Sequence, residues 1–195
     1  MKTLMAVAGC LLCLCLAGTS GRTPAQGEKR KREHYHAVAF RMGGAGATPS
    51  VDLYIDSYTT NEEAKRLSGM LLDSGPDALL KALADGKRKG KITLTGRVGF
   101  YDFKLVRSWP TETGRRIIAV GDRPITFLET YNSTRSKDYN FGILMVDLTK
   151  DKKGKEKGEG VLIYAAKVKL LEGNKLDIEN YGINPVRLMG VRQLK

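Results

Sequence analysis

The stretch TTNEEAKRLSGMLLDSGPDALLKALADG, residues 59–86, is the one part of the sequence with convincing helical periodicity. Thr60 and Glu63 have the spacing of a capping box, in which each side chain accepts a hydrogen bond from the backbone N–H of the other residue. Apolar residues then recur at helical spacing: Ala64, Leu67, Met70 and Leu71, followed by Leu79, Leu80 and Leu83. Gly75 and Pro76 interrupt this pattern, and Pro76 suits the first position of a new helix. The stretch therefore predicts two helices, laid as a hairpin against a β-structure.

On both sides of these helices the sequence is typical of short strands. Val51, Leu53 and Ile55 alternate with polar residues, as in a half-buried strand, whereas residues 141–148 are almost continuously apolar. Further predicted strands are residues 36–41, 92–95, 98–106, 115–120, 125–129, 161–171, 176–179 and 186–191. The spacing predicts a mainly β (α+β) fold: an antiparallel β-sandwich or barrel of about eight or nine strands with a two-helix insertion.

The first 25 residues have the composition of an export signal. Lys2 precedes an apolar run over residues 3–17, which is shorter than the roughly 17–25 residues of a membrane-spanning helix, and small residues follow it. We expect residues 1–25 to be a signal peptide, residues 26–34 a disordered basic linker, and residues 35–195 a single β-rich domain. The protein is thus predicted to be exported, either periplasmic or extracellular. The lipobox-like residues 7–10 leave a lipid-anchored form as an alternative.

Cysteine usage narrows the chemistry further. All three cysteines, Cys10, Cys13 and Cys15, lie in the predicted signal peptide. A mature chain without cysteine has no disulfide framework, no thiolate metal site and no cysteine nucleophile. An exported protein without disulfides fits a bacterial envelope better than a small eukaryotic secreted module.

Other candidate catalytic or ligand-binding residues are few. His34 and His36 could present two imidazoles on one strand face, but the sequence has no third histidine to complete a metal site. Two pairs of carboxylates lie on predicted strand faces: Asp52 with Asp56, and Asp177 with Glu179. Solvent exposure explains both pairs, and acid/base catalysis would need a facing partner. We therefore predict no cofactor and no metal site, and a non-enzymatic role is favoured.

The strongest functional signal is positive charge, with a formal net charge of +12. For an exported protein, this favours anionic lipid, polysaccharide or protein as the partner over nucleic acid. Two clusters are candidate anion-binding residues: Lys87, Arg88, Lys89 and Lys91 in a connector after the helices, and Lys150, Lys152, Lys153, Lys155 and Lys157 at a hairpin tip. Lysine-rich loops without aromatic neighbours give electrostatic adhesion rather than specific nucleic-acid readout. If both loops emerge at one end of the fold, they form a basic rim.

The leading hypothesis is a non-catalytic envelope or secreted binding module that meets an anionic surface or a protein partner. A small-ligand carrier is one alternative, with a barrel interior lined by aromatic residues: Tyr101, Trp109, Tyr131, Tyr139, Tyr164 and Tyr181. The bulky residues predicted to point inward favour a filled interior instead. A carboxylate-based hydrolase is the other alternative.

Overall fold

The computed structural model describes residues 32–40, 48–125, 138–151, 154–181 and 185–194. The elements in these segments are β1 (Glu33–Phe40), β2 (Ser50–Ile55), α1 (Asn61–Ala84), β3 (Gly90–Leu94), β4 (Tyr101–Phe103), β5 (Leu105–Pro110), β6 (Gly114–Gly121), β7 (Phe141–Lys150), β8 (Glu156–Leu171), the 3₁₀ turn η3 (Glu172–Asn174), β9 (Lys175–Asn180) and β10 (Val186–Gln193). The predicted signal peptide lies outside the described residues. β1 begins at Glu33, within the segment predicted to be a linker.

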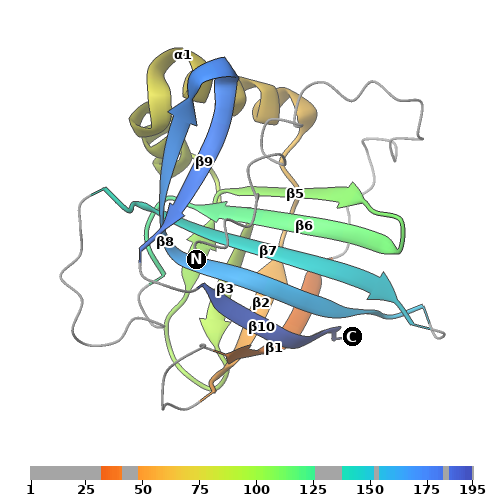
Figure 1. Cartoon of the computed structure of the whole chain (residues 1–195). Coiled ribbons are helices and arrows are strands. Elements are labelled where there is room, and N and C mark those ends of the chain that lie inside the picture. Colours follow the sequence, from red (N-terminus) through yellow and green to blue (C-terminus); the bar gives the residue numbers. More distant parts are fainter. Residues whose placement is uncertain (1–31, 41–47, 126–137, 152–153, 182–184, 195) are drawn as a thin grey trace, which may run out of the picture.

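Nine of the strands form one antiparallel, nearly closed barrel. Their order is β4-β3-β2-β1-β10-β8-β7-β6-β5, and β9 pairs only with β8. Lys104 joins the two edge strands β4 and β5, and its backbone N–H donates to the carbonyl of Val120 on β6 at 2.9 Å. Figure 1 shows β5 to β8 running across the front, with β2 and β3 crossing behind them. The mainly β, antiparallel prediction is confirmed, and of its two forms the fold is barrel-like.

The inside of the barrel is filled by apolar side chains. The largest of these are fully buried and come from strands all around the ring: Tyr35, Ile55, Ile92, Phe103, Ile117, Leu144, Leu148, Leu162 and Leu188. Alternation along each strand sends every second side chain inward, which is why short alternating segments could build this core. The interior is therefore a packed core along the middle of the strands.

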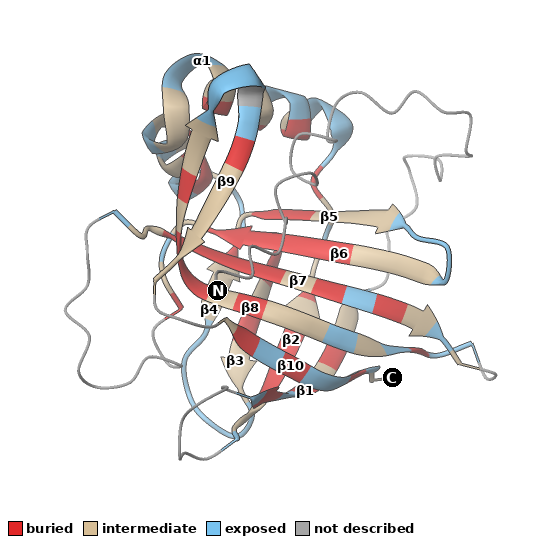
Figure 2. Cartoon of the chain, viewed as in Figure 1, coloured by how far each residue is buried: buried red, intermediate tan, exposed pale blue. Residues whose placement is uncertain are grey.

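A second apolar cluster lies outside the barrel, beneath α1. Leu67, Leu71, Leu79 and Leu83 of the helix belong to one cluster with the outer faces of β5 to β9: Leu105, Ile118, Val120, Phe141, Ile143, Ala166, Val168 and Leu176. Figure 2 shows these buried positions along β5 to β8 and on one side of α1, whose other side is exposed. The helix thus covers one outer face of the barrel, and the β8–β9 extension packs beside it.

The prediction of two helices is wrong. Residues 61–84 form one helix, α1, with a kink at Gly75, whose φ of 82° and ψ of −177° lie outside the helical range. Only glycine adopts this conformation readily, so the helix bends there without ending. The predicted start is confirmed, because the backbone N–H of Glu63 donates to the Thr60 side chain at 3.2 Å. None of the helices in the described segments is long and apolar enough to cross a membrane.

Two further predictions need correction, and a third lies almost wholly outside the described residues. The single strand predicted over residues 98–106 is two strands, β4 and β5, because the chain crosses from one edge of the sheet to the other at Lys104. The hairpin tip predicted to carry the lysines from Lys150 to Lys157 is shorter, since β7 continues to Lys150 and β8 begins at Glu156. The strand predicted over residues 125–129 lies outside the described residues except for Ile125, which is not in a strand.

Candidate functional site

The first predicted basic cluster lies in the connector between α1 and β3, where it is drawn into ion pairs. The Arg88 guanidinium lies 3.3 Å from Asp56 and 4.0 Å from Asp102. The Lys89 ammonium lies 2.9 Å from Glu63, in the first turn of α1. These cations therefore neutralise carboxylates of the same protein. Lys87, the remaining member of the connector, is exposed.

Lys91, on β3, lies in an aromatic environment that the sequence did not predict. Its ammonium is 5.0 Å from the ring centroid of Tyr54 and 5.2 Å from that of Phe100. The ring of His34 in turn stacks on the ring of Tyr54, with the two ring centroids 4.2 Å apart. Lys91, Tyr54 and His34 are directly opposite one another on β3, β2 and β1, so the contacts follow from strand register. Lys91 is thus held against rings by cation–π attraction.

The second predicted cluster lies where β7 and β8 meet. Lys150, Lys155 and Lys157 are exposed, whereas Lys152 and Lys153 lie outside the described residues. In the sheet, β2, β1 and β10 separate β3 from β8, so the two clusters sit on strands well apart around the barrel.

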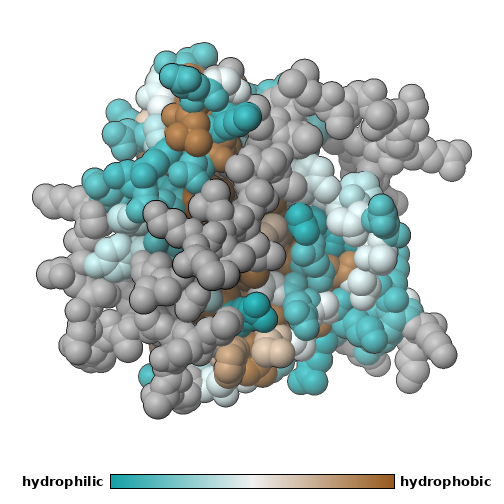
Figure 3. All heavy atoms as spheres, viewed as in Figure 1, coloured by the Kyte–Doolittle hydropathy of each residue, from teal (hydrophilic) through white to brown (hydrophobic). Residues whose placement is uncertain are grey.

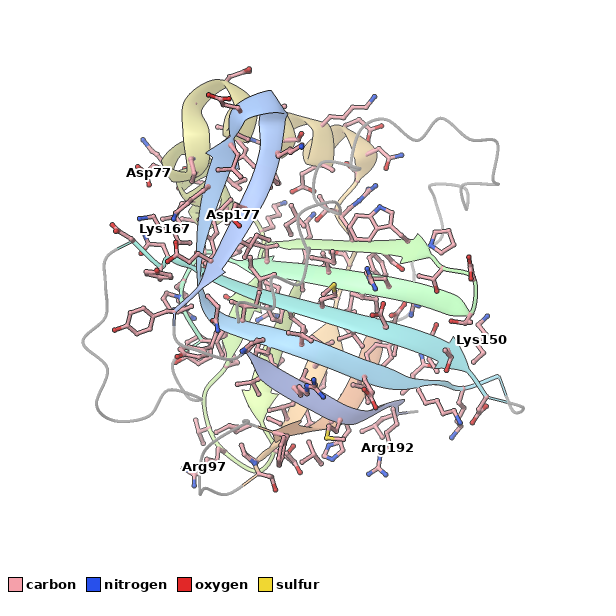
Figure 4. All side chains as sticks on the ribbon, viewed as in Figure 1. Asp77, Arg97, Lys150, Lys167, Asp177 and Arg192 are labelled. Carbon is pink, nitrogen blue, oxygen red and sulfur yellow. The ribbon has the colours of Figure 1, made fainter. Side chains whose placement is uncertain are left out.

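Strand register adds an arginine to this second cluster. Lys157 on β8 is directly opposite Arg192 on β10, and Arg192 is opposite His36 on β1. Lys157 and Arg192 are both exposed. Like charges directly opposite each other in an antiparallel pair destabilise it. Figure 4 labels Arg192 and Lys150 on the side of the molecule where β10 and β7 end. We call Lys150, Lys155, Lys157 and Arg192 the basic end.

Sequence reasoning missed Arg192 because it lies far from the lysines along the chain. Strict alternation from the buried Val186 and Leu188 would place Arg192 on the inner face, but a register shift between Leu188 and Val191 turns it outward, and the β8–β10 pairing places it beside Lys157. The register shift and the pairing of the strands were therefore the missing information.

Close to this end of the barrel is a polar network centred on Arg115, the first inward-facing side chain of β6. Its Nε and Nη2 donate to the two carboxylate oxygens of Glu156, each at 2.7 Å. Nη2 also lies 2.8 Å from Glu33, and Nη1 donates to the hydroxyl of Tyr58 at 2.8 Å. The hydroxyl of Tyr35 donates to Glu156 at 2.6 Å. One guanidinium thus ties β6 to β1, β8 and the segment before α1.

The electrostatics of this network follow from burial and pairing. Burial by itself raises the pKa of Glu156, but hydrogen bonds from Arg115 and Tyr35 outweigh it and hold the pKa below its ordinary value. Burial and the hydrogen bond to Glu156 both raise the pKa of Tyr35. Burial and the charge of Glu33 raise the pKa of Tyr58. The network therefore favours a charged Glu156 and neutral phenols, an arrangement suited to fastening strands.

His34 and His36 both lie within hydrogen-bond distance of the carboxylate of Asp52. Nε2 of His34 and Nδ1 of His36 each lie 3.2 Å from the same oxygen of Asp52, and Thr95 donates to its other oxygen at 2.8 Å. Burial raises the pKa of Asp52, but the hydrogen bonds from Thr95, His36 and His34 outweigh burial and lower it. Within the described segments, no group of three or more histidine, cysteine or acidic residues could hold a metal ion.

Two of the remaining predicted carboxylates, Asp56 and Glu179, are engaged in ion pairs, and Asp177 is half-buried on β9 opposite Lys169. Asp56 lies 3.3 Å from Arg32 as well as from Arg88. Glu179 on β9 lies 2.5 Å from Lys169 and accepts a hydrogen bond from the hydroxyl of Tyr139 at 2.5 Å.

The aromatic residues predicted to line a pocket are divided between the two apolar clusters. Tyr164 is buried, and its hydroxyl donates to the carbonyl of Tyr181 at 2.7 Å. The rings of Tyr139 and Tyr181 meet edge to face with centroids 5.1 Å apart, and Tyr101 packs against the same core. Trp109 packs against the outer cluster beneath α1, and Tyr131 lies outside the described residues.

Comparison with protein families, with curated proteins and with solved structures finds no match to this chain.

Proposed function

We propose that the protein is a non-catalytic binding module that meets an anionic surface through the basic end. The observation that supports this most directly is the pairing of Lys157 with Arg192 on neighbouring strands, both exposed. Two cations held side by side repel each other, and an anionic partner would relieve that repulsion. Lys150 and Lys155 add positive charge at the adjoining hairpin tip.

The protein's overall charge works in the same direction. A net charge of +12 attracts a polyanion over distances up to the Debye length, which is about 8 Å at physiological ionic strength. The connector residues Arg88 and Lys89 are less suited to this role, because carboxylates of the same chain already neutralise them. The anion-binding residues proposed here are therefore those on and near β8 and β10, without the connector after α1.

The alternatives receive less support. A small-ligand carrier needs space between the strands, and the inward side chains of this barrel are bulky and buried. A carboxylate-based hydrolase needs an acid and a base that can reach a substrate, whereas Glu33 and Glu156 are tied to Arg115.

The test is binding of the protein to dextran sulfate and to vesicles rich in phosphatidylglycerol, over a series of salt concentrations. We expect binding at low salt that weakens as salt rises, and a loss of about fivefold for each cation of the basic end replaced by glutamine. The variant Lys157→Gln/Arg192→Gln measures this loss. The matched control, Lys65→Gln/Lys81→Gln, removes two exposed charges from α1. The absence of binding at low salt, or an equal loss in the control, would overturn the proposal.

A further inference from the structure

We infer that the anionic surface is a lipid bilayer, which the protein contacts through apolar side chains beside the basic end. This inference rests on the proposed function and names its partner. Three large apolar side chains on β1 and β10 are exposed: Val38 by 37%, Phe40 by 42% and Met189 by 46%. We call these three residues the apolar patch.

Strand register brings the patch together on one outer face of the barrel. Val38 on β1 is directly opposite Met189 on β10, and Phe40 is opposite Arg187. The row of His36, Arg192 and Lys157 lies next along the same strands. Figure 3 shows hydrophobic side chains reaching the surface at the lower edge of the view, where Figure 1 places β1 and β10, with hydrophilic side chains beside them.

A β-bulge shapes this part of the face. The register between β10 and β8 shifts between Leu188 and Val191, and Gly190 has a φ of 60°, a value that favours glycine. Both bulge residues, Met189 and Gly190, are exposed, whereas their neighbours Leu188 and Val191 are buried. The bulge thus places an extra residue on the outer face beside Val38.

The composition of the face distinguishes a bilayer from other polyanions. An anionic bilayer offers phosphate groups to Arg187, Arg192 and Lys157, and an apolar phase just beneath them to the patch. A sulfated or carboxylated polysaccharide offers the charges without the apolar phase. A single patch of apolar side chains bordered by arginine and lysine therefore fits the interface of a lipid surface best.

One carboxylate, that of Glu159, would weaken binding to an anionic bilayer and so provides a test. Glu159 is exposed and lies on β8 between Lys157 and Val161, so it shares the outer face with the basic residues. It would face the negative lipid surface, and its removal is expected to strengthen binding. We expect Glu159→Gln to bind phosphatidylglycerol vesicles about fivefold more tightly than the natural sequence.

The experiment measures how tightly one set of variants binds each of three ligands. The ligands are vesicles of phosphatidylcholine with phosphatidylglycerol, vesicles of phosphatidylcholine alone, and dextran sulfate. The key variant is Phe40→Ser/Met189→Ser, and its matched control is Leu171→Ser, which changes an exposed apolar side chain at the far end of β8. Each protein is expressed with its whole sequence, so every variant has the same N-terminal residues, and circular dichroism checks the fold.

We expect Phe40→Ser/Met189→Ser to bind the anionic vesicles about tenfold more weakly, because the patch no longer buries apolar surface. Its binding to dextran sulfate is expected to stay unchanged, and Leu171→Ser is expected to behave as the natural sequence. Unchanged vesicle binding by the patch variant, or binding of dextran sulfate without binding of vesicles, would overturn the bilayer inference and leave the proposed function standing. Failure of all three ligands to bind would remove both.

Discussion

Replacement of Arg115 by methionine tests the polar network inside the barrel. Methionine keeps much of the length of the side chain but removes the guanidinium, which donates to Glu156, Glu33 and Tyr58. The side chains of Arg115 and Glu156 are only 20% and 9% exposed, so the carboxylate would remain in a poorly solvated place without its cation. Breaking one side of such a buried pair costs about 3–5 kcal/mol. We expect about 3 kcal/mol, since the pair keeps some contact with water.

Urea unfolding, followed by circular dichroism, measures this loss. The neighbouring residue provides the control, because Arg116 pairs with Asp147 on the outer face, where the two side chains are 34% and 54% exposed. We expect Arg116→Met to cost less than about 1 kcal/mol. The pH dependence should also weaken: Arg115 helps to hold the pKa of Glu156 below its ordinary value, so the variant should lose less stability than the natural sequence as the pH falls through about 4.5. Equal losses for the two variants at neutral pH would refute the reasoning.

Three further predictions concern single positions. Gly158→Ala is expected to destabilise the protein by about 1–3 kcal/mol, because a Cβ there would lie 1.8 Å from the carbonyl oxygen of Asp147. Gly69→Ala in α1 is expected to stabilise by about 0.5–1 kcal/mol, because its Cβ would make only an ordinary contact, 3.9 Å from an Asp73 carboxylate oxygen; thermal melts compare the two variants. The hydrogen bond to Glu179 raises the pKa of Tyr139 to about 12, and Glu179→Gln should lower it in a titration of ring-labelled tyrosine followed by NMR. The pKa of Glu156 is lower in the folded protein than its ordinary value of 4.5, so the charged side chain stabilises the fold above that pH, and this contribution is lost as the pH falls below it. Glu156→Gln should therefore flatten the loss of stability below pH 4.5, and an unchanged acid profile would contradict this.

Local chemistry made parts of the fold predictable from sequence. The Thr60 cap and the leucine spacing after it identified the start and the buried face of α1, because both depend on residues within one or two turns. Alternation predicted most strands for the same reason. Gly75 shows the limit of local patterns: a glycine followed by proline can end a helix or bend it, and the packing of both halves of α1 against the outer face of the barrel favours a bend.

The candidate site was harder to predict from the sequence, because its geometry depends on which strands pair and in which register. Arg115 alternates with Ile117 and is therefore expected to point inward, but its partners Glu33 and Glu156 are 82 and 41 residues away in sequence. The same holds for Arg192 beside Lys157 and for Val38 beside Met189. A one-residue shift in register would undo each of these pairings, and no local pattern fixes that register.

The position of β10 in the ring has a consequence for the order of folding. β10 is inserted between β1 and β8, although its residues follow those of every other strand in the sheet. Until residues 186–193 have been synthesised, strands β1 to β4 and strands β5 to β8 are two separate sheets, each with an unpaired edge. Contacts of such large sequence separation slow folding, and exposed edges invite pairing with other chains. Pairing of β1 and β8 with β10, and with it closure of the ring, therefore has to wait for residues 186–193.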